Sequence, residues 1–203
     1  MTVLWLTCAI FVVSMLYASV GQAGGSGYLA AMALLAFPPE VMKPTALVLN
    51  ILVATISTIK FSRAGYVGWP TFWPFAVTSV PAAFIGGMLP PPGSVYNVLV
   101  GGVLLYAAYR LWRTSQGVTA RDNQPPPLWG ALIIGAWIGL LAGFTGTGGG
   151  IVLGPFLLTL GWAETRHTLG LSAAINLSNS AAGLLGHLSS VMALPSAIPL
   201  WAA

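Results

Sequence analysis

Long apolar runs separated by short polar stretches dominate the chain. Five runs precede a polar linker and three follow it: residues 3–20, 28–37, 45–59, 72–89 and 95–112, then 129–144, 151–160 and 169–187. Most of these runs approach the length of about 20 residues that a helix needs to cross a bilayer core. The pattern predicts an all-α fold, a polytopic membrane helix bundle. We interpret residues 3–20 as a retained helix rather than a signal peptide, because no positive charge precedes them.

Two of the runs, 28–37 and 151–160, are too short to span a membrane. A ten-residue helix is about 15 Å long, roughly half of a bilayer core. Each short run follows a glycine cluster and precedes a longer run that carries Ser, Thr and Asn. We therefore expect two short discontinuous or re-entrant helices, whose irregular backbone needs surrounding protein or a watery cavity.

The two halves resemble each other at an offset of about 123 residues, so that 25–27 falls on 148–150, Thr45 on Thr168 and Ser57 on Ser180. This predicts a first transmembrane repeat at 1–113, a polar linker at 114–127 and a second repeat at 128–203 that is incomplete at its C-terminal end. Duplicated halves are typical of secondary transporters, which bind substrate where the halves meet.

The composition fits a membrane protein, because 57% of the residues are hydrophobic and only 5% are charged. A soluble domain is about one quarter charged, so a soluble globular enzyme is excluded. The seven Lys and Arg residues form no stripe, which argues against a nucleic-acid partner. The expected partners are a small anionic substrate and membrane lipid, with a homo-oligomer left open. The single cysteine, Cys8, excludes a disulfide framework and a cysteine metal cluster.

Loop charges restrict the topology. Lys60 and Arg63 lie two spans away from Arg110, Arg113 and Arg121, so both loops lie on one side, which the positive-inside rule makes cytoplasmic. If the run at 28–37 spans the membrane, the two halves are inverted. If it is re-entrant, they are parallel.

The glycine clusters are the strongest candidates for a binding site. They comprise Gly24, Gly25, Ser26 and Gly27 in the first half, and Thr147, Gly148, Gly149 and Gly150 in the second. A glycine-rich backbone can approach a ligand closely, and the following helix presents free N–H groups and a positive dipole end that favour an anion. The alternative is close helix packing, which we expect for the GxxxG series of Gly135, Gly139 and Gly143. Apart from Arg110 at the end of the run at 95–112, we find no Lys or Arg within the runs, so these N–H groups are the expected source of positive potential.

Asparagines in the runs after the short helices complete the candidate site. Asn50 lies in the first half, and Asn176 and Asn179 lie in the second. Amides are costly against lipid and should face the interior, either as interhelical hydrogen bonds or as the lining of an oxyanion site. Neither Asp nor Glu lies within a run, and we expect Glu40 and Glu164 at helix starts. No catalytic group, metal site or cofactor is predicted.

These motifs resemble the TauE/SafE family of sulfite exporter-like membrane proteins. The second half carries the resemblance best, in Gly146-Thr-Gly-Gly-Gly150, Pro155-Phe-Leu-Leu158, Gly161-Trp162 and Thr168-Leu-Gly-Leu-Ser172. The first half is looser, with Gly24-Gly-Ser-Gly27, Pro38-Pro39 and Pro44-Thr45, and the resemblance covers about residues 13–186. It implies export or uptake of small sulfur-containing anions such as sulfite or sulfonates.

The favoured hypothesis is a secondary anion transporter, multi-pass in a bacterial inner membrane. A passive channel and a non-transporting scaffold subunit are the alternatives. We also expect the starts of the two short helices to approach each other in one shared polar cavity, with Asn50 and Asn176 in its lining.

Overall fold

The computed structural model describes residues 24–89 and 126–193, together with the single positions Phe11, Met15, Val98, Gly101, Gly102, Leu105 and Tyr109. In the two continuous ranges the helices are α2 (Gly25–Leu34), α3 (Pro39–Arg63), α4 (Trp69–Met88), α6 (Leu128–Thr145), α7 (Gly150–Leu160) and α8 (Thr165–Ala193). No strand occurs within these ranges. The predicted all-α fold is therefore confirmed for the described part of the chain.

The helix ends agree closely with the apolar runs. The two short runs at 28–37 and 151–160 become α2 and α7, which have 10 and 11 residues. The runs at 3–20 and 95–112 and the linker at 114–127 lie almost entirely outside the described residues. Their predicted structures stay predictions.

The start of α3 differs from the expected one. The helix begins at Pro39, six residues before the run predicted at 45–59, and it continues through Pro44. Pro39 is tolerated at the first helical position, because the N–H that it lacks has no intrahelical acceptor there. Pro44 lies in the second turn, where its missing N–H removes one intrahelical hydrogen bond, the one to the carbonyl oxygen of Glu40. Because α3 extends beyond the run at both ends, it includes Lys43, Lys60 and Arg63, which corrects the expectation that this membrane helix holds no Lys or Arg.

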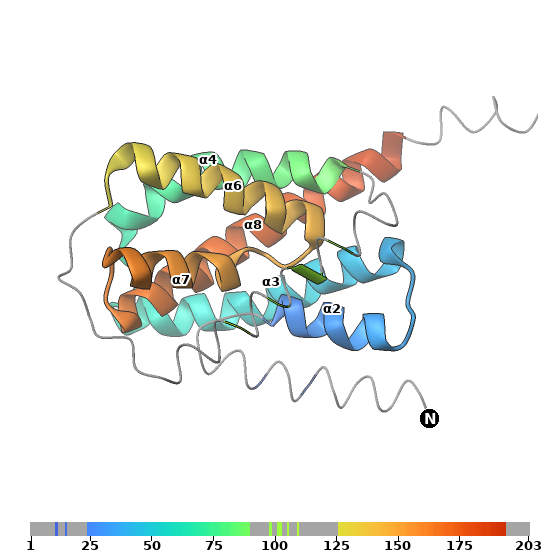
Figure 1. The fold of residues 1–203 in the computed structure, drawn as a ribbon, viewed down its shortest axis with the longest axis horizontal. Helices are drawn as coiled ribbons and strands as arrows, with labels where there is room; N and C mark the ends of the chain where they lie inside the picture. The colour runs from blue at the N-terminus through green and yellow to red at the C-terminus, as the bar shows by residue number, and fades with distance from the viewer. Residues whose placement is uncertain are drawn as a thin grey trace, which may run out of the picture.

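Two helix pairs, α2–α3 and α7–α8, run in opposite directions through the molecule. Figure 1 shows α2 and α7 starting near the middle and pointing toward opposite ends. The long helices α3 and α8 are antiparallel: Gly170 near the start of α8 packs on Tyr66 just after α3, and Gly183 later in α8 packs on Leu47 early in α3.

The glycine series of α6 packs against α4. A Cβ atom on Gly135, Gly139 or Gly143 would overlap the backbone of Phe75, Ser79 or Ala83, respectively. The predicted packing role of this series is confirmed. It holds α6 in position directly before the second glycine cluster.

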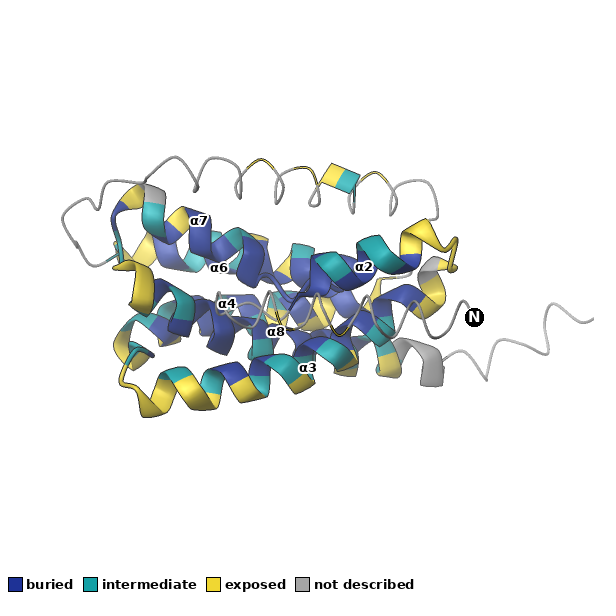
Figure 2. Cartoon of the chain, turned by 90° about the horizontal axis from the view of Figure 1, so that it is seen from below, coloured by how far each residue is buried: buried dark blue, intermediate teal, exposed yellow. Residues whose placement is uncertain are grey.

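Much of the surface is apolar. Figure 2 shows exposed residues along the outer side of α3, and these include the large apolar side chains of Val48, Leu52, Ile56 and Ile59. Two helices, Glu40–Arg63 and Leu128–Thr145, are long and apolar enough to cross a membrane. The interior holds two apolar clusters and also buried polar side chains, among them Ser26, Asn50, Ser172, Asn176 and Asn179. An apolar surface around buried polar side chains suits a protein that is surrounded by lipid.

Candidate functional site

Both short helices begin at a glycine in the left-handed conformation. The N-cap of α2 is Gly24, with φ 84° and ψ 14°, and the N-cap of α7 is Gly149, with φ 85° and ψ −14°. Glycine adopts this conformation without the steric cost that a Cβ atom brings. The two glycine clusters therefore form the same kind of break, one immediately before each short helix.

The two breaks lie together, as the sequence predicts. A Cβ atom on Gly25 would lie 2.7 Å from the carbonyl oxygen of Thr147 and 2.5 Å from Asn50 Nδ2. Asn50 Nδ2 also donates a hydrogen bond of 3.1 Å to the carbonyl oxygen of Gly146. Asn50 of α3 thus joins the start of α2 to the backbone of the second break.

Helix α8 encloses the second break from another side. A Cβ atom on Gly148 would overlap the amide of Asn176 and lie 2.6 Å from Ser180 Oγ. Asn176 Nδ2 is 3.2 Å from the Cβ position of Gly150, and Asn179 Nδ2 is 3.3 Å from that of Gly149. At Gly148 no side chain larger than hydrogen fits against α8, and at Gly149 and Gly150 the approach to α8 is tight.

Several polar atoms at this point lack a hydrogen-bond partner within the described part of the chain. These atoms are Nδ2 and Oδ1 of Asn179, Oδ1 of Asn50 and Oγ of Ser172. Asn179 and Asn50 are fully buried. Leaving a buried polar group unsatisfied costs about 1–3 kcal/mol, and such a group in a native protein needs an explanation. A bound polar ligand would supply one.

The helix starts contribute positive potential at the same place. The N–H groups in the first turn of a helix have no acceptor within that helix, and the aligned peptide dipoles add about half a positive charge. Gly24, Ser26 and Gly27 occupy the cap and first turn of α2, where Ser26 is buried and Gly27 half-buried. Thr147 is also buried, and its hydroxyl lies 2.9 Å from that of Thr145.

All the predicted site residues therefore belong to the two breaks or to the asparagines that contact the second break. The backbone is closely packed here, and an open cavity between the breaks stays a prediction. A pocket of about 360 Å³ lies elsewhere, between the starts of α4 and α8, where Gly68, Trp162, Glu164 and His167 line it. The exposed carboxylate of Glu164 makes that pocket less suited to an anion than the breaks.

Sequence reasoning missed one charged residue near the breaks. Lys43 is fully buried, and its Nζ donates hydrogen bonds to the carbonyl oxygens of Gly86, Gly87 and Leu89. Lys43 precedes Asn50 by seven residues, which places both on the same face of a helix. This spacing could have indicated that Lys43 is buried near the breaks. The Pro44 that follows it concealed this signal, because proline usually marks a helix boundary. Among the described residues, no group of three or more His, Cys, Asp or Glu side chains is placed to hold a metal ion.

The described part of the chain is thus a helical bundle with two apolar helices long enough to cross a membrane and with buried polar residues at the paired breaks. The sequence matches the family model "Sulfite exporter TauE/SafE" over residues 6–203. It is also 42% identical over 199 residues to "Probable membrane transporter protein y4hK" of Sinorhizobium fredii (strain NBRC 101917 / NGR234), a match that covers 97% of this chain and 81% of that protein. No solved structure matches. The chain belongs to the TauE/SafE family of sulfite exporter-like membrane transporters, as its motifs indicate.

Proposed function

We propose that this protein is a secondary transporter for a small sulfur-containing anion such as sulfite or a sulfonate. The anion binds where the starts of α2 and α7 meet. The first-turn N–H groups of both helices donate hydrogen bonds to its oxygen atoms, and the amides of Asn50, Asn176 and Asn179 complete the site. The family description supports the substrate class.

One observation carries this proposal: Asn179 is fully buried beside the α7 cap, and both of its amide atoms lack a partner. A structural asparagine in a membrane helix would bond across to its neighbour, which is worth about 0.6–2 kcal/mol. Asn179 makes no such hydrogen bond within the described part of the chain. An oxyanion would accept a hydrogen bond from its Nδ2 atom.

The chemistry of the break favours a compact anion without a large organic group. Helix N-termini stabilise negative charge without placing an arginine in the hydrocarbon region. The tight approach of Gly148 and Gly150 to α8 leaves room for few atoms. An oxyanion of a few heavy atoms, with oxygens pointing in several directions, can accept from both helix starts together.

The antiparallel helix pairs suggest how such a site could be reached from both sides. We assign α2–α3 and α7–α8 to two inverted repeats, each with one short discontinuous helix, which is the first of the two topologies that the loop charges leave open. In inverted-repeat transporters, discontinuous helices place their N-termini at mid-membrane, and rocking of one repeat against the other gives alternating access. The opposite directions of α2 and α7 (Figure 1) support this assignment.

Counterflow of labelled sulfite in proteoliposomes tests the proposal. Vesicles preloaded with unlabelled sulfite should accumulate the label transiently, and unlabelled sulfate inside should give a different extent of counterflow. Steady electrical conductance without counterflow would indicate a passive channel. Absence of both, in protein that is folded and inserted, would favour a non-transporting scaffold and contradict the proposal.

A further inference from the structure

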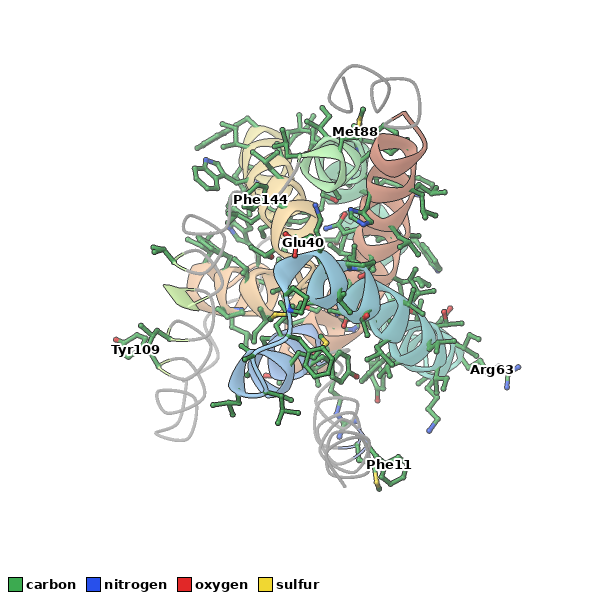
Figure 3. All side chains as sticks on the ribbon, turned by 90° about the vertical axis from the view of Figure 1, so that its right-hand side faces the viewer. Phe11, Glu40, Arg63, Met88, Tyr109 and Phe144 are labelled. Carbon is green, nitrogen blue, oxygen red and sulfur yellow. The ribbon has the colours of Figure 1, made fainter. Side chains whose placement is uncertain are left out.

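Lys43 is a buried charge for which the proposed site gives no role. Of the lysines and arginines in the described part of the chain, Lys60, Arg63 and Arg166 are exposed, whereas Lys43 has 0% exposure. The side chain of Arg63, labelled in Figure 3, points away from the helices. A charged group inside a membrane protein is costly and usually marks an ion or substrate pathway.

The contacts of Lys43 do not balance its charge. Its Nζ donates to the carbonyl oxygens of Gly86 at 3.2 Å, Gly87 at 2.9 Å and Leu89 at 3.2 Å, and it lies 5.9 Å from the centre of the Phe144 ring. All of these partners are neutral. The C-terminal dipole of α4 supplies about half a negative charge, so that roughly half a positive charge remains without a counterion.

Lys43 also adjoins the proposed anion site. The Cβ position of Gly146 lies 3.1 Å from the carbonyl oxygen of Lys43 and 3.3 Å from its Cα. Asn50, two turns further along α3, donates to the carbonyl of the same Gly146. Lys43 and Asn50 therefore contact one segment of the second break, with Lys43 on the side where α3 begins and α4 ends.

Within residues 24–89 and 126–193, the other charged groups near this end of the bundle do not compensate Lys43. His187 of α8 lies close enough to Lys43 to interact with it electrostatically, and it can only add positive charge. Glu40, in the first turn of α3, is exposed. The surroundings of Lys43 thus attract anions.

We infer that Lys43 is a second anion-binding group, located between the breaks and the end of the bundle where α3 begins. The Nζ atom exchanges the carbonyl oxygens of α4 for an oxygen of the anion as the anion passes to or from the breaks. This inference rests on the proposed function, and it assigns the side chain that supplies a full positive charge to the anion's path.

The alternative is that Lys43 only caps the C-terminus of α4. The two roles make different demands on the side chain. A cap needs a hydrogen-bond donor, which a glutamine amide also provides, whereas an anion site needs the positive charge. Lys43→Gln therefore separates the roles, Lys43→Arg keeps the charge, and Lys60→Gln removes an exposed charge from the same helix as a control.

The test measures the sulfite concentration that half-maximally raises the melting temperature of the purified protein, and the KM for sulfite counterflow. Lys43→Gln should weaken both about 10- to 100-fold, the factor for the loss of one charge-assisted hydrogen bond. Lys43→Arg should stay within about threefold of the wild type, as should Lys60→Gln.

Two outcomes would overturn the inference. If Lys43→Gln responds to sulfite like the wild type, Lys43 is only a helix cap, and the proposed function stands. If Lys43→Gln and Lys43→Arg both lose the response and both melt at a lower temperature without sulfite, the residue is structural. A wild type that neither transports nor responds to sulfite, sulfate or sulfonate would refute the proposed function itself and the inference with it.

Discussion

The two breaks begin their helices in the same way but are built differently around that start. Within residues 24–27, where the structure describes the first break, one glycine is left-handed, Gly24, and the polar neighbour on a long helix is Asn50. The second has three left-handed glycines, Gly146, Gly148 and Gly149, and α8 encloses it with two asparagines and a serine. The positive helix end is thus common to both breaks, whereas the backbone constraint and most of the amide donors belong to the second.

This difference predicts that substitutions in the second break do more damage than those in the first. Gly148→Ala should have the largest effect, because it combines a left-handed backbone, φ 76°, with overlap of the new Cβ and the Asn176 amide. The conformational cost alone is about 1–2 kcal/mol. We expect sulfite counterflow to fall to background at equal protein abundance.

Gly65→Ala is the matched control for this prediction. Gly65 has φ 75°, and nothing lies within 4 Å of its Cβ position. Gly65→Ala therefore places alanine in a left-handed backbone, as Gly148→Ala does, but its new Cβ atom overlaps no neighbour. Equal loss of counterflow in both variants would show that backbone strain, rather than contact with α8, explains the effect.

Gly25→Ala in the first break should have an intermediate effect. Its backbone is helical, so that only the close approach to Asn50 Nδ2 and the Thr147 carbonyl is disturbed. Overpacking of this kind costs about 1–3 kcal/mol, which corresponds to a sulfite KM raised about 5- to 100-fold. Gly68→Ala, at the cap of α4, has its nearest neighbour at 3.7 Å and should leave the KM unchanged. If Gly25→Ala is also silent, the first break takes no part in binding.

Replacement of the asparagines should give the smallest effects and should separate binding from stability. Asn179→Leu removes an amide without partners, so we expect about tenfold weaker sulfite binding with an unchanged melting temperature. Asn50→Leu also removes the hydrogen bond to Gly146, a contact worth about 0.6–2 kcal/mol in a membrane. It should therefore lower the melting temperature as well. A large drop in melting temperature for Asn179→Leu would show that this residue is structural.

The helices and the site residues were predictable to different degrees. The lengths of the apolar runs and the positions of the glycine clusters predicted the ends of α2 and α7 to within about three residues. This was possible because a lipid-facing helix must be apolar along its length. The meeting of the breaks at Gly25 and Thr147 also followed from the sequence, since short helices must begin inside the protein.

The hydrogen-bond partners of the buried side chains could not be predicted from the sequence. The buried state of Lys43 depends on α4 ending beside it, which places the carbonyls of Gly86, Gly87 and Leu89 around Nζ. That contact spans more than 40 residues of chain, and no local pattern encodes it. The difference between Asn179, without partners, and Asn176, which accepts from Ser180, likewise depends on packing against the second break.

The central claim is that an anion binds between the starts of α2 and α7. An experimental structure with selenite, a heavier oxyanion of the same shape as sulfite, tests it most directly, because anomalous scattering locates the selenium atom. The account predicts a peak with selenite oxygens about 3 Å from first-turn N–H groups of both short helices and from Asn179 Nδ2. A peak confined to the pocket lined by Glu164 and His167, or no peak in protein that transports sulfite, would contradict it.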